Sequence, residues 1–273
     1  MNTKHKYRVA IISDMTPESP RNWDNVGTMV CWHDRYSLGD EQPGEDPQEY
    51  MLALAEEFSP GITERVERFA DRLWEDLKER EGLTLEDRLR SHGMAVDAYQ
   101  AERVHAILDR HVIMLPLHLM DHSGLSMNTG RYSCPWDSGQ VGYIYASRDK
   151  AREEWGTSPK PDEMTDEEFW ERRLRQEVET YSQYLEGDVY GYVLEKARGY
   201  TQTTLFEDGE VEEGEGLEWE VVDSCWGFFG YDPTENGMGG HVADVVLQAM
   251  VRVDVSYGDG EPSWEYFETE EEL

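Results

Sequence analysis

The amino-acid sequence predicts an α+β fold, a single domain whose mostly antiparallel sheet is covered by several amphipathic helices. Two patterns lead to this prediction. Short apolar runs bounded by turn residues are typical of strands, and they occur both early and in the middle of the chain. Elsewhere, apolar residues recur at three- and four-residue steps, which places them on one face of a helix.

Six segments have the pattern of strands. The stretch from 112 to 147 has only three charged residues, Asp121, Arg131 and Asp137, so we expect it to hold the buried sheet and its functional edge. The six expected strands are 7–12, 27–33, 112–120, 140–147, 189–194 and 219–222.

Residues 46–111 have a helical pattern and are interpreted as a helical insert. Within it, Ser59 and Pro60 are expected to start a helix as N-cap and first residue. Thr165 and Glu168 predict a capping box, and Gly187 is the expected end of that helix. A last short helix is expected over 241–251. We expect one globular domain over 1–253, followed by an acidic tail over 254–273.

Charge limits what the protein is able to bind. Fifty-nine Asp and Glu residues against 25 Lys and Arg give a net charge of −34. Such a surface repels nucleic acid and anionic membranes and attracts basic partners. No apolar run approaches the roughly 20 residues that span a bilayer, and the start lacks the apolar region of a signal peptide. We therefore expect a cytoplasmic protein that binds neither membranes nor nucleic acid directly.

Two explanations of the acidity stay open. Nine acids and no base lie between Glu207 and Asp223, which is consistent with a surface that binds a basic partner. The alternative is adaptation to a salty cytoplasm, because the chain has only six Lys against nineteen Arg. At about 1 M salt the Debye length is about 3 Å, so repulsion between surface carboxylates nearly vanishes.

Four short segments are dense in Trp, Asp, Gly, Cys and His, and a fifth, 187–191, joins them in the resemblance given below. They are 23–33 (WDNVGTMVCWH), 121–124 (DHSG), 133–140 (SCPWDSGQ), 187–191 (GDVYG) and 223–228 (DSCWGF). Together they resemble a family of uncharacterised proteins found in phages, plasmids and their hosts. The resemblance covers roughly residues 20–40 and 112–230. It implies a mobile-element context and brings no established activity with it.

A zinc site is one chemical hypothesis. Its candidate ligands are Cys31, His33, His122 and Cys134, which are residue types that zinc prefers. Their spacing is not that of paired C-x-x-C or helical H-x-x-x-H motifs. The alternative is that these are buried cysteines and hydrogen-bonded histidines. No other cofactor is expected.

Catalysis is a second hypothesis, with Asp121, His122, Cys134 and Asp137 as candidate residues. No nucleophile elbow is present, and the Gly-flanked Asp, His and Ser residues equally suit ordinary turns. A magnesium nuclease would need a basic groove for phosphate, and none is evident. A third set consists of candidate binding residues from the motif segments: Trp23, Asp24, Asn25, Trp136, Asp188, Asp223 and Trp226.

The function that we expect is that of an acidic accessory protein of a mobile element. Duplex DNA carries about one charge per 1.7 Å, so 34 charges correspond to on the order of 60 Å of duplex. A protein of this kind would act as a nucleic-acid mimic that counters a basic, DNA-binding host defence protein, for example in antirestriction. The alternative is a halophile-adapted enzyme or zinc-binding protein whose site is built from the Cys, His and Asp segments.

Overall fold

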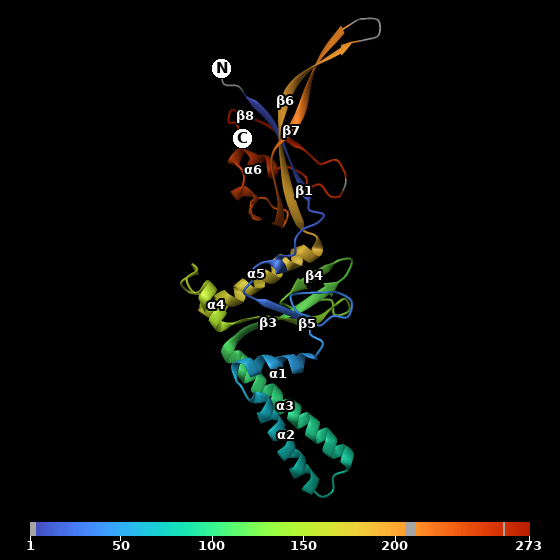
Figure 1. The fold of residues 1–273 in the computed structure, drawn as a ribbon, viewed down its shortest axis with the longest axis vertical. Helices are drawn as coiled ribbons and strands as arrows, with labels where there is room; N and C mark the ends of the chain where they lie inside the picture. The colour runs from blue at the N-terminus through green and yellow to red at the C-terminus, as the bar shows by residue number, and fades with distance from the viewer. Residues whose placement is uncertain (1–3, 206–210, 259) are drawn as a thin grey trace. The chain divides into compact units, whose positions relative to one another are not determined.

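The computed structural model describes residues 4–205, 211–258 and 260–273 (Figure 1). It confirms an α+β fold with antiparallel strand pairing, although the strands form two four-stranded sheets. Contacts divide the chain into two compact units, each described separately below. In the described ranges, no helix is both long and apolar enough to cross a membrane. The first unit comprises 1–22, 124–126 and 180–273, and the second comprises 23–123 and 127–179.

Strands and helices are mixed along the chain, with three consecutive helices before three consecutive strands. The strands are β1 (His5–Ser13), β2 (Thr28–Cys31), β3 (Val112–Asp121), β4 (Leu125–Asn128), β5 (Ser138–Ser147), β6 (Val189–Leu205), β7 (Val211–Phe229) and β8 (Glu265–Thr269). The α-helices are α1 (Pro47–Phe58), α2 (Ile62–Glu79), α3 (Leu85–His111), α4 (Arg148–Trp155), α5 (Asp166–Glu186) and α6 (Asp244–Met250), with short 3₁₀ turns η1 (Pro20–Asn22) and η2 (Met238–Gly240).

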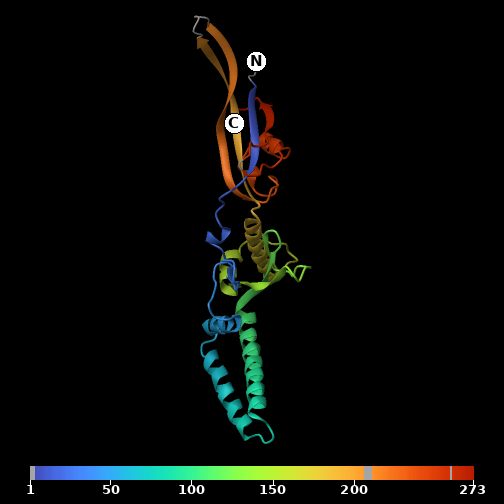
Figure 2. The ribbon, with the colours of Figure 1, turned by 90° about the vertical axis from the view of Figure 1, so that its right-hand side faces the viewer.

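The first unit is built on the sheet β7-β6-β1-β8. Alternate residues of β1 and β6, including Tyr7, Val9 and Tyr192, form its core together with α6. The strands β6 and β7 are much longer than the expected 189–194 and 219–222, because they pair from Val189↔Phe229 to Leu205↔Val211, with two shifts of register along the way. Figure 2 shows this pair continuing past β1 as a two-stranded arm. Residues 207–210 of the acidic segment lie outside the described residues.

The C-terminal segment expected as an acidic tail contains a strand of this sheet. Strand β8 pairs antiparallel with β1, from His5↔Thr269 to Val9↔Glu265. Phe267 stacks on Tyr7 with their ring centroids 5.7 Å apart, and the backbone N–H of Leu273 donates to the Tyr7 hydroxyl. Residues 265–273 are therefore attached to the core of the first unit.

The second unit is built on the sheet β2-β5-β3-β4. Both β2 and β3 pair antiparallel with β5. Buried residues of α1, α2 and α3 form a core with Val112, against which Met114 and Tyr145 of the sheet pack. On α5, Leu174 is fully buried, and a Cβ added at Gly27 would lie 2.7 Å from its side chain. Helices therefore cover the sheet, as predicted.

The helical insert consists of α1 and an antiparallel pair, α2 and α3 (Figure 1). The prediction that Ser59 and Pro60 start a helix is wrong. Ser59 ends α1, where its N–H donates to the Ala55 carbonyl. Helix α2 starts at Ile62, after Gly61 in the left-handed conformation at φ 83°. Glu56 accepts the N–H groups of Gly61 and Thr63, so a carboxylate caps this helix instead of the serine.

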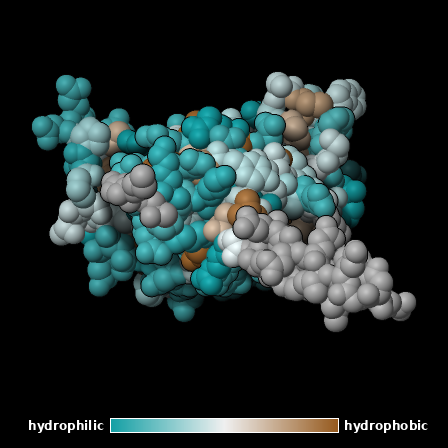
Figure 3. Space-filling view, turned by 90° about the horizontal axis from the view of Figure 1, so that it is seen from above, coloured by the Kyte–Doolittle hydropathy of each residue, from teal (hydrophilic) through white to brown (hydrophobic). Residues whose placement is uncertain are grey.

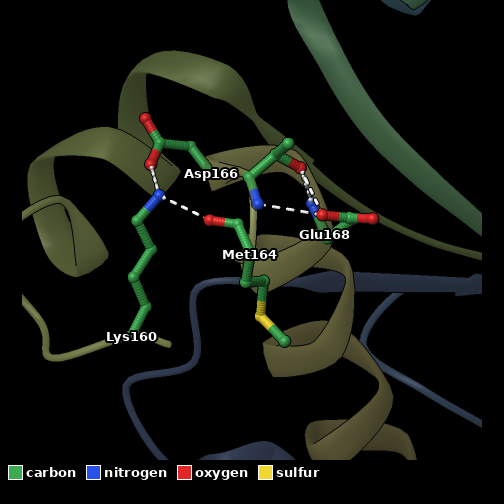
Figure 4. A network of polar contacts seen from close by, with 5 residues as sticks. Lys160, Met164, Asp166 and Glu168 are labelled. Carbon is green, nitrogen blue, oxygen red and sulfur yellow. Dashed lines mark hydrogen bonds and ion pairs between the residues drawn. The ribbon is translucent and has the colours of Figure 1, made fainter. Parts of the chain in front are cut away.

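The predicted capping box of α5 is confirmed. The Thr165 hydroxyl accepts the Glu168 N–H at 3.2 Å, and the Glu168 carboxylate accepts the Thr165 N–H at 2.8 Å. In Figure 4, Lys160 reaches the Met164 carbonyl and the Asp166 carboxylate at the same helix start. The two capping-box hydrogen bonds between Thr165 and Glu168 satisfy N–H groups that the first helical turn leaves unpaired. At the other end, Gly187 adopts φ 73° as expected.

Candidate functional site

Three of the five motif segments converge in the second unit for a topological reason. Since β2 and β3 both run antiparallel to β5, the ends of β2 and β3 meet the beginning of β5 at one end of the sheet. The chain after Cys31, the turn after Asp121 and the loop before Ser138 therefore come together there. Backbone hydrogen bonds fix the arrangement: the Trp32 N–H donates to Val141, and the Asp121 N–H donates to the Asp137 carbonyl at 2.8 Å.

Asp137 lies at the centre of this cluster. Its Oδ2 is 3.2 Å from Nδ1 of His122 and 3.5 Å from Sγ of Cys134, so one carboxylate oxygen serves both groups. The Ser138 hydroxyl holds the loop closed by donating to the Cys134 carbonyl. Among the catalytic candidates, His122 and Cys134 thus each contact Asp137.

Asp121 has a different set of partners. Its Oδ2 lies 2.5 Å from Nη2 of Arg35 and 3.1 Å from the hydroxyl of Tyr36. The sequence interpretation did not include Arg35 or Tyr36. Their position two and three residues after His33, just beyond the motif segment 23–33, was the available signal, because a turn there brings a basic and an aromatic side chain to Asp121.

His33 stabilises that turn. Its Nδ1 accepts the backbone N–H groups of both Arg35 and Tyr36 at 3.2 Å, and its ring stacks on the Tyr36 ring with 5.0 Å between centroids. Because Nδ1 is the acceptor, the neutral ring carries its proton on Nε2. Cys31, two residues earlier, is fully buried, and a Cβ at Gly39 would lie 3.2 Å from its sulfur.

No group of three or more His, Cys, Asp or Glu side chains lies close enough to share a metal ion within the described part of the chain. The four zinc candidates do not form one group. Cys31 is in the buried sheet, His33 bonds to backbone N–H groups, and His122 and Cys134 both contact Asp137. The neighbouring His118 is buried, and loss of hydration, followed by the charge of Arg131, lowers its pKa, which favours the neutral ring.

A hollow of about 720 Å³ adjoins the cluster. Its wall is made by the segment after β2 and by the start of β5, with Gln42, Pro43 and Gly44 opposite. The exposed side chain of Arg35 lines it, as does His33. The Arg35 guanidinium that lines this hollow is already paired with Asp121.

The chemistry available here is proton transfer. With His122 Nδ1 directed at the Asp137 carboxylate, its Nε2 is left to exchange protons with solvent or a ligand, and the carboxylate orients the ring. The Cys134 thiol donates to Asp137 rather than to His122, so the Cys–His pair that activates a thiol nucleophile is not formed among these residues.

The seven binding candidates divide between the units. Trp23, Asp24, Asn25 and Trp136 belong to the second unit, where the Trp136 side chain is 92% exposed. Asn25 helps to anchor its loop, since its carbonyl accepts from Lys150 at 2.9 Å. Asp188, Asp223 and Trp226 belong to the first unit.

The two motif segments of the first unit form a packed bulge. A side chain at Gly191 would overlap the Trp226 ring and would lie 2.8 Å from the Cys225 carbonyl. The pairing of β6 and β7 is irregular at this point. The Tyr192 hydroxyl donates to Asp223 at 2.6 Å, and burial, followed by this hydrogen bond, raises the pKa of Tyr192.

The chain matches no known protein-family model. No curated protein and no solved structure is similar to it either.

Proposed function

We propose that this protein is an acidic interaction protein of mobile-element type, a nucleic-acid mimic that occupies the DNA-binding surface of a basic host defence protein. The observation that carries the proposal is the location of the charge. Among side chains whose burial is described, His118 and Ser182 are the only buried polar ones, so no Asp or Glu is buried. The face shown in Figure 3 is accordingly mostly hydrophilic.

The excess charge has no internal compensation. Even if every one of the 25 Lys and Arg residues were paired with its own acid, 34 of the 59 carboxylates would be left over. Many ion pairs of the described residues are also exposed, such as Arg90–Glu86 and Arg152–Asp149, and exposed pairs contribute little to stability. A negative surface of this density attracts cationic proteins over a Debye length.

A displacement assay tests the proposal. A fluorescent DNA duplex is bound to a purified restriction endonuclease, and its anisotropy is followed as the protein is added at increasing salt. We expect the duplex to be displaced at low salt, with displacement weakening by about 10³-fold or more between 50 and 200 mM salt if six to ten contacts are made. Polyglutamate of equal charge is the control for charge without shape.

Matched variants locate the effect. Residues 207–218 and residues 64–81 contain seven acids each, but only the second set is interspersed with bases. Neutralising the first set as Asn and Gln should abolish displacement, whereas neutralising the second should leave most of it. Displacement that survives the first change, or that polyglutamate reproduces, would contradict nucleic-acid mimicry.

A second candidate function is supported by the Asp137–His122 pair, which is arranged for proton transfer. The variants His122→Ala and Asp137→Asn distinguish it within the same assay. The mimic requires both variants to displace DNA like the unaltered protein. Loss of displacement in both, with the fold retained, would instead assign the function to this cluster.

A further inference from the structure

The second unit has a groove that neither the motif segments nor the candidate site uses. It encloses about 1100 Å³ and lies along the first half of β3, between α3 and α5, with α1 at one end. Its floor is apolar and includes Val104, Leu108, Met114 and Pro116. A cavity of this volume with an apolar floor has the ordinary character of a ligand site.

One wall of the groove is an unpaired strand edge. Strand β4 has four residues and follows β3 after a three-residue turn, so it pairs only with the end of β3 next to that turn. The beginning of β3, Val112–Pro116, has β5 on one side and no strand of the described ranges on the other. Pro116 fits this position, since proline within sheets is confined to edges and bulges.

The rim of the groove is negative. Five acids line it, whereas Arg148 is the only Lys or Arg among the lining residues. Arg148 is already engaged, because its Nη2 contacts Glu167 at 2.6 Å and the Asp109 carbonyl at 3.1 Å. Glu171 pairs at 3.1 Å with Arg175, which does not line the groove, and Asp97 and Glu102 form no ion pair with another described residue. The rim therefore carries an excess of carboxylates above an apolar floor.

We propose that this groove binds an extended, basic peptide segment of the partner protein, in which Lys or Arg side chains alternate with apolar ones. The apolar side chains enter the floor, the cations reach the rim, and the peptide backbone pairs with the free edge of β3. The inference rests on the proposed function for the existence of a basic partner. It adds where that partner docks and which segment of it is recognised.

The test measures binding of a fluorescein-labelled ten-residue peptide of alternating Lys and Val to the full chain. Ala101 is an exposed groove residue, and Ala101→Trp should obstruct the groove without changing its charge. Combined Asp97→Asn, Glu102→Gln and Glu171→Gln should weaken binding by about tenfold, as the loss of three exposed ion pairs implies. A peptide of alternating Lys and Ser, with equal charge and no apolar side chains, should bind more weakly.

A charge-matched control is available on α2, which contributes no residue to the groove. Combined Glu67→Gln, Asp71→Asn and Asp76→Asn removes the same charge and should leave peptide affinity within about twofold. The proposal that this groove binds a peptide would be overturned if the peptide did not bind, or if both triple variants weakened its binding equally. It would also be overturned if Ala101→Trp bound the peptide undiminished, or if micromolar spermidine displaced the peptide. If the peptide binds in the groove but the protein fails to displace DNA, the proposed function is overturned and the peptide-binding groove is still supported.

Discussion

Gly142 occupies a position in β5 where no side chain fits. It pairs with Cys31 of β2 on one side and with Leu117 of β3 on the other. A Cβ there would overlap the Val30 carbonyl oxygen and would lie 2.9 Å from the Cys31 Cα. These are backbone atoms of β2, and backbone atoms that are paired in a sheet do not move aside in the way that the end of a flexible side chain does. The glycine therefore allows β2 to approach β5, and this approach brings His33 and Arg35 to the candidate site.

Gly142→Ala should destabilise the protein by about 3 kcal/mol or more, because overpacking against backbone lies at the upper end of its usual cost. The measurement is urea unfolding followed by circular dichroism. Gly139→Ala is the matched control in the same strand, since nothing lies within 4 Å of its added Cβ. A loss in Gly142→Ala no larger than that of the control would show that β2 does not approach β5 so closely.

Part of the candidate site could be predicted residue by residue. Cys134 and Asp137 are close in sequence, and Asp121 and His122 belong to one turn, so each pair was found together. The contact between the pairs depends on β3 and β5 being neighbours, which local patterns do not encode. The Asp121 partners Arg35 and Tyr36 depend in addition on β2.

At the scale of elements, the junction of α1 and α2 shows how one carboxylate replaces the usual cap. Gly61 has no side chain with which to cap α2, and Glu56 reaches over from the last turn of α1. Hydrogen bonds from the backbone N–H groups of Thr63 and Gly61 hold the pKa of Glu56 below its ordinary value. The charged form is therefore favoured by folding.

Glu56→Gln should lower the thermal midpoint at pH 7, because the carboxylate accepts these hydrogen bonds better than an amide does. A group with a depressed pKa stabilises the fold above its unfolded pKa, and that contribution disappears as the pH falls through the folded pKa. The thermal midpoint of Glu56→Gln should lie below that of the exposed control Glu57→Gln at pH 7, and this difference should thus shrink between pH 5 and pH 3. A pH-independent deficit would show that the ionised carboxylate has no special role.

Element types followed from the sequence more readily than element lengths did. Apolar periodicity and the capping box of Thr165 and Glu168 predicted most helices correctly. The length of β6 and β7 was missed, because Gly199, Gly214 and Gly216 and the many acids have low strand propensity. Pairing over the whole hairpin overrides that local preference. Ser59 was misassigned because a serine before a proline resembles a helix start.

For the whole molecule, the dominant physical quantity is electrostatic self-repulsion. All described carboxylates are at least partly exposed, so added salt screens them directly. The Debye length falls from about 10 Å at 0.1 M to about 3 Å at 1 M. Mimicry requires a protein that is folded at low salt, where the attraction to a basic partner is strongest. Salt adaptation instead predicts a protein that folds only at high salt.

We expect the protein to be folded in 50 mM KCl and to gain thermal stability as KCl is raised toward 1 M. Far-ultraviolet circular dichroism during thermal unfolding, at KCl concentrations from 50 mM to 3 M, measures this. Sodium sulfate at equal ionic strength separates screening from general salting-out. A chain that is unfolded at 50 mM and folds only in molar KCl would identify salt adaptation as the reason for the −34 charge.

The first sheet joins segments from opposite ends of the chain, since β1 lies between β6 and β8. During synthesis on a ribosome, β1 emerges before β6 and β8, and it has no partner from this sheet until about 180 further residues have been made. The second unit, whose last residue is Glu179, is already complete by then. A nascent chain of this length would therefore carry a folded second unit and an unpaired β1, and chaperones that bind extended apolar segments would be able to bind β1 during that time.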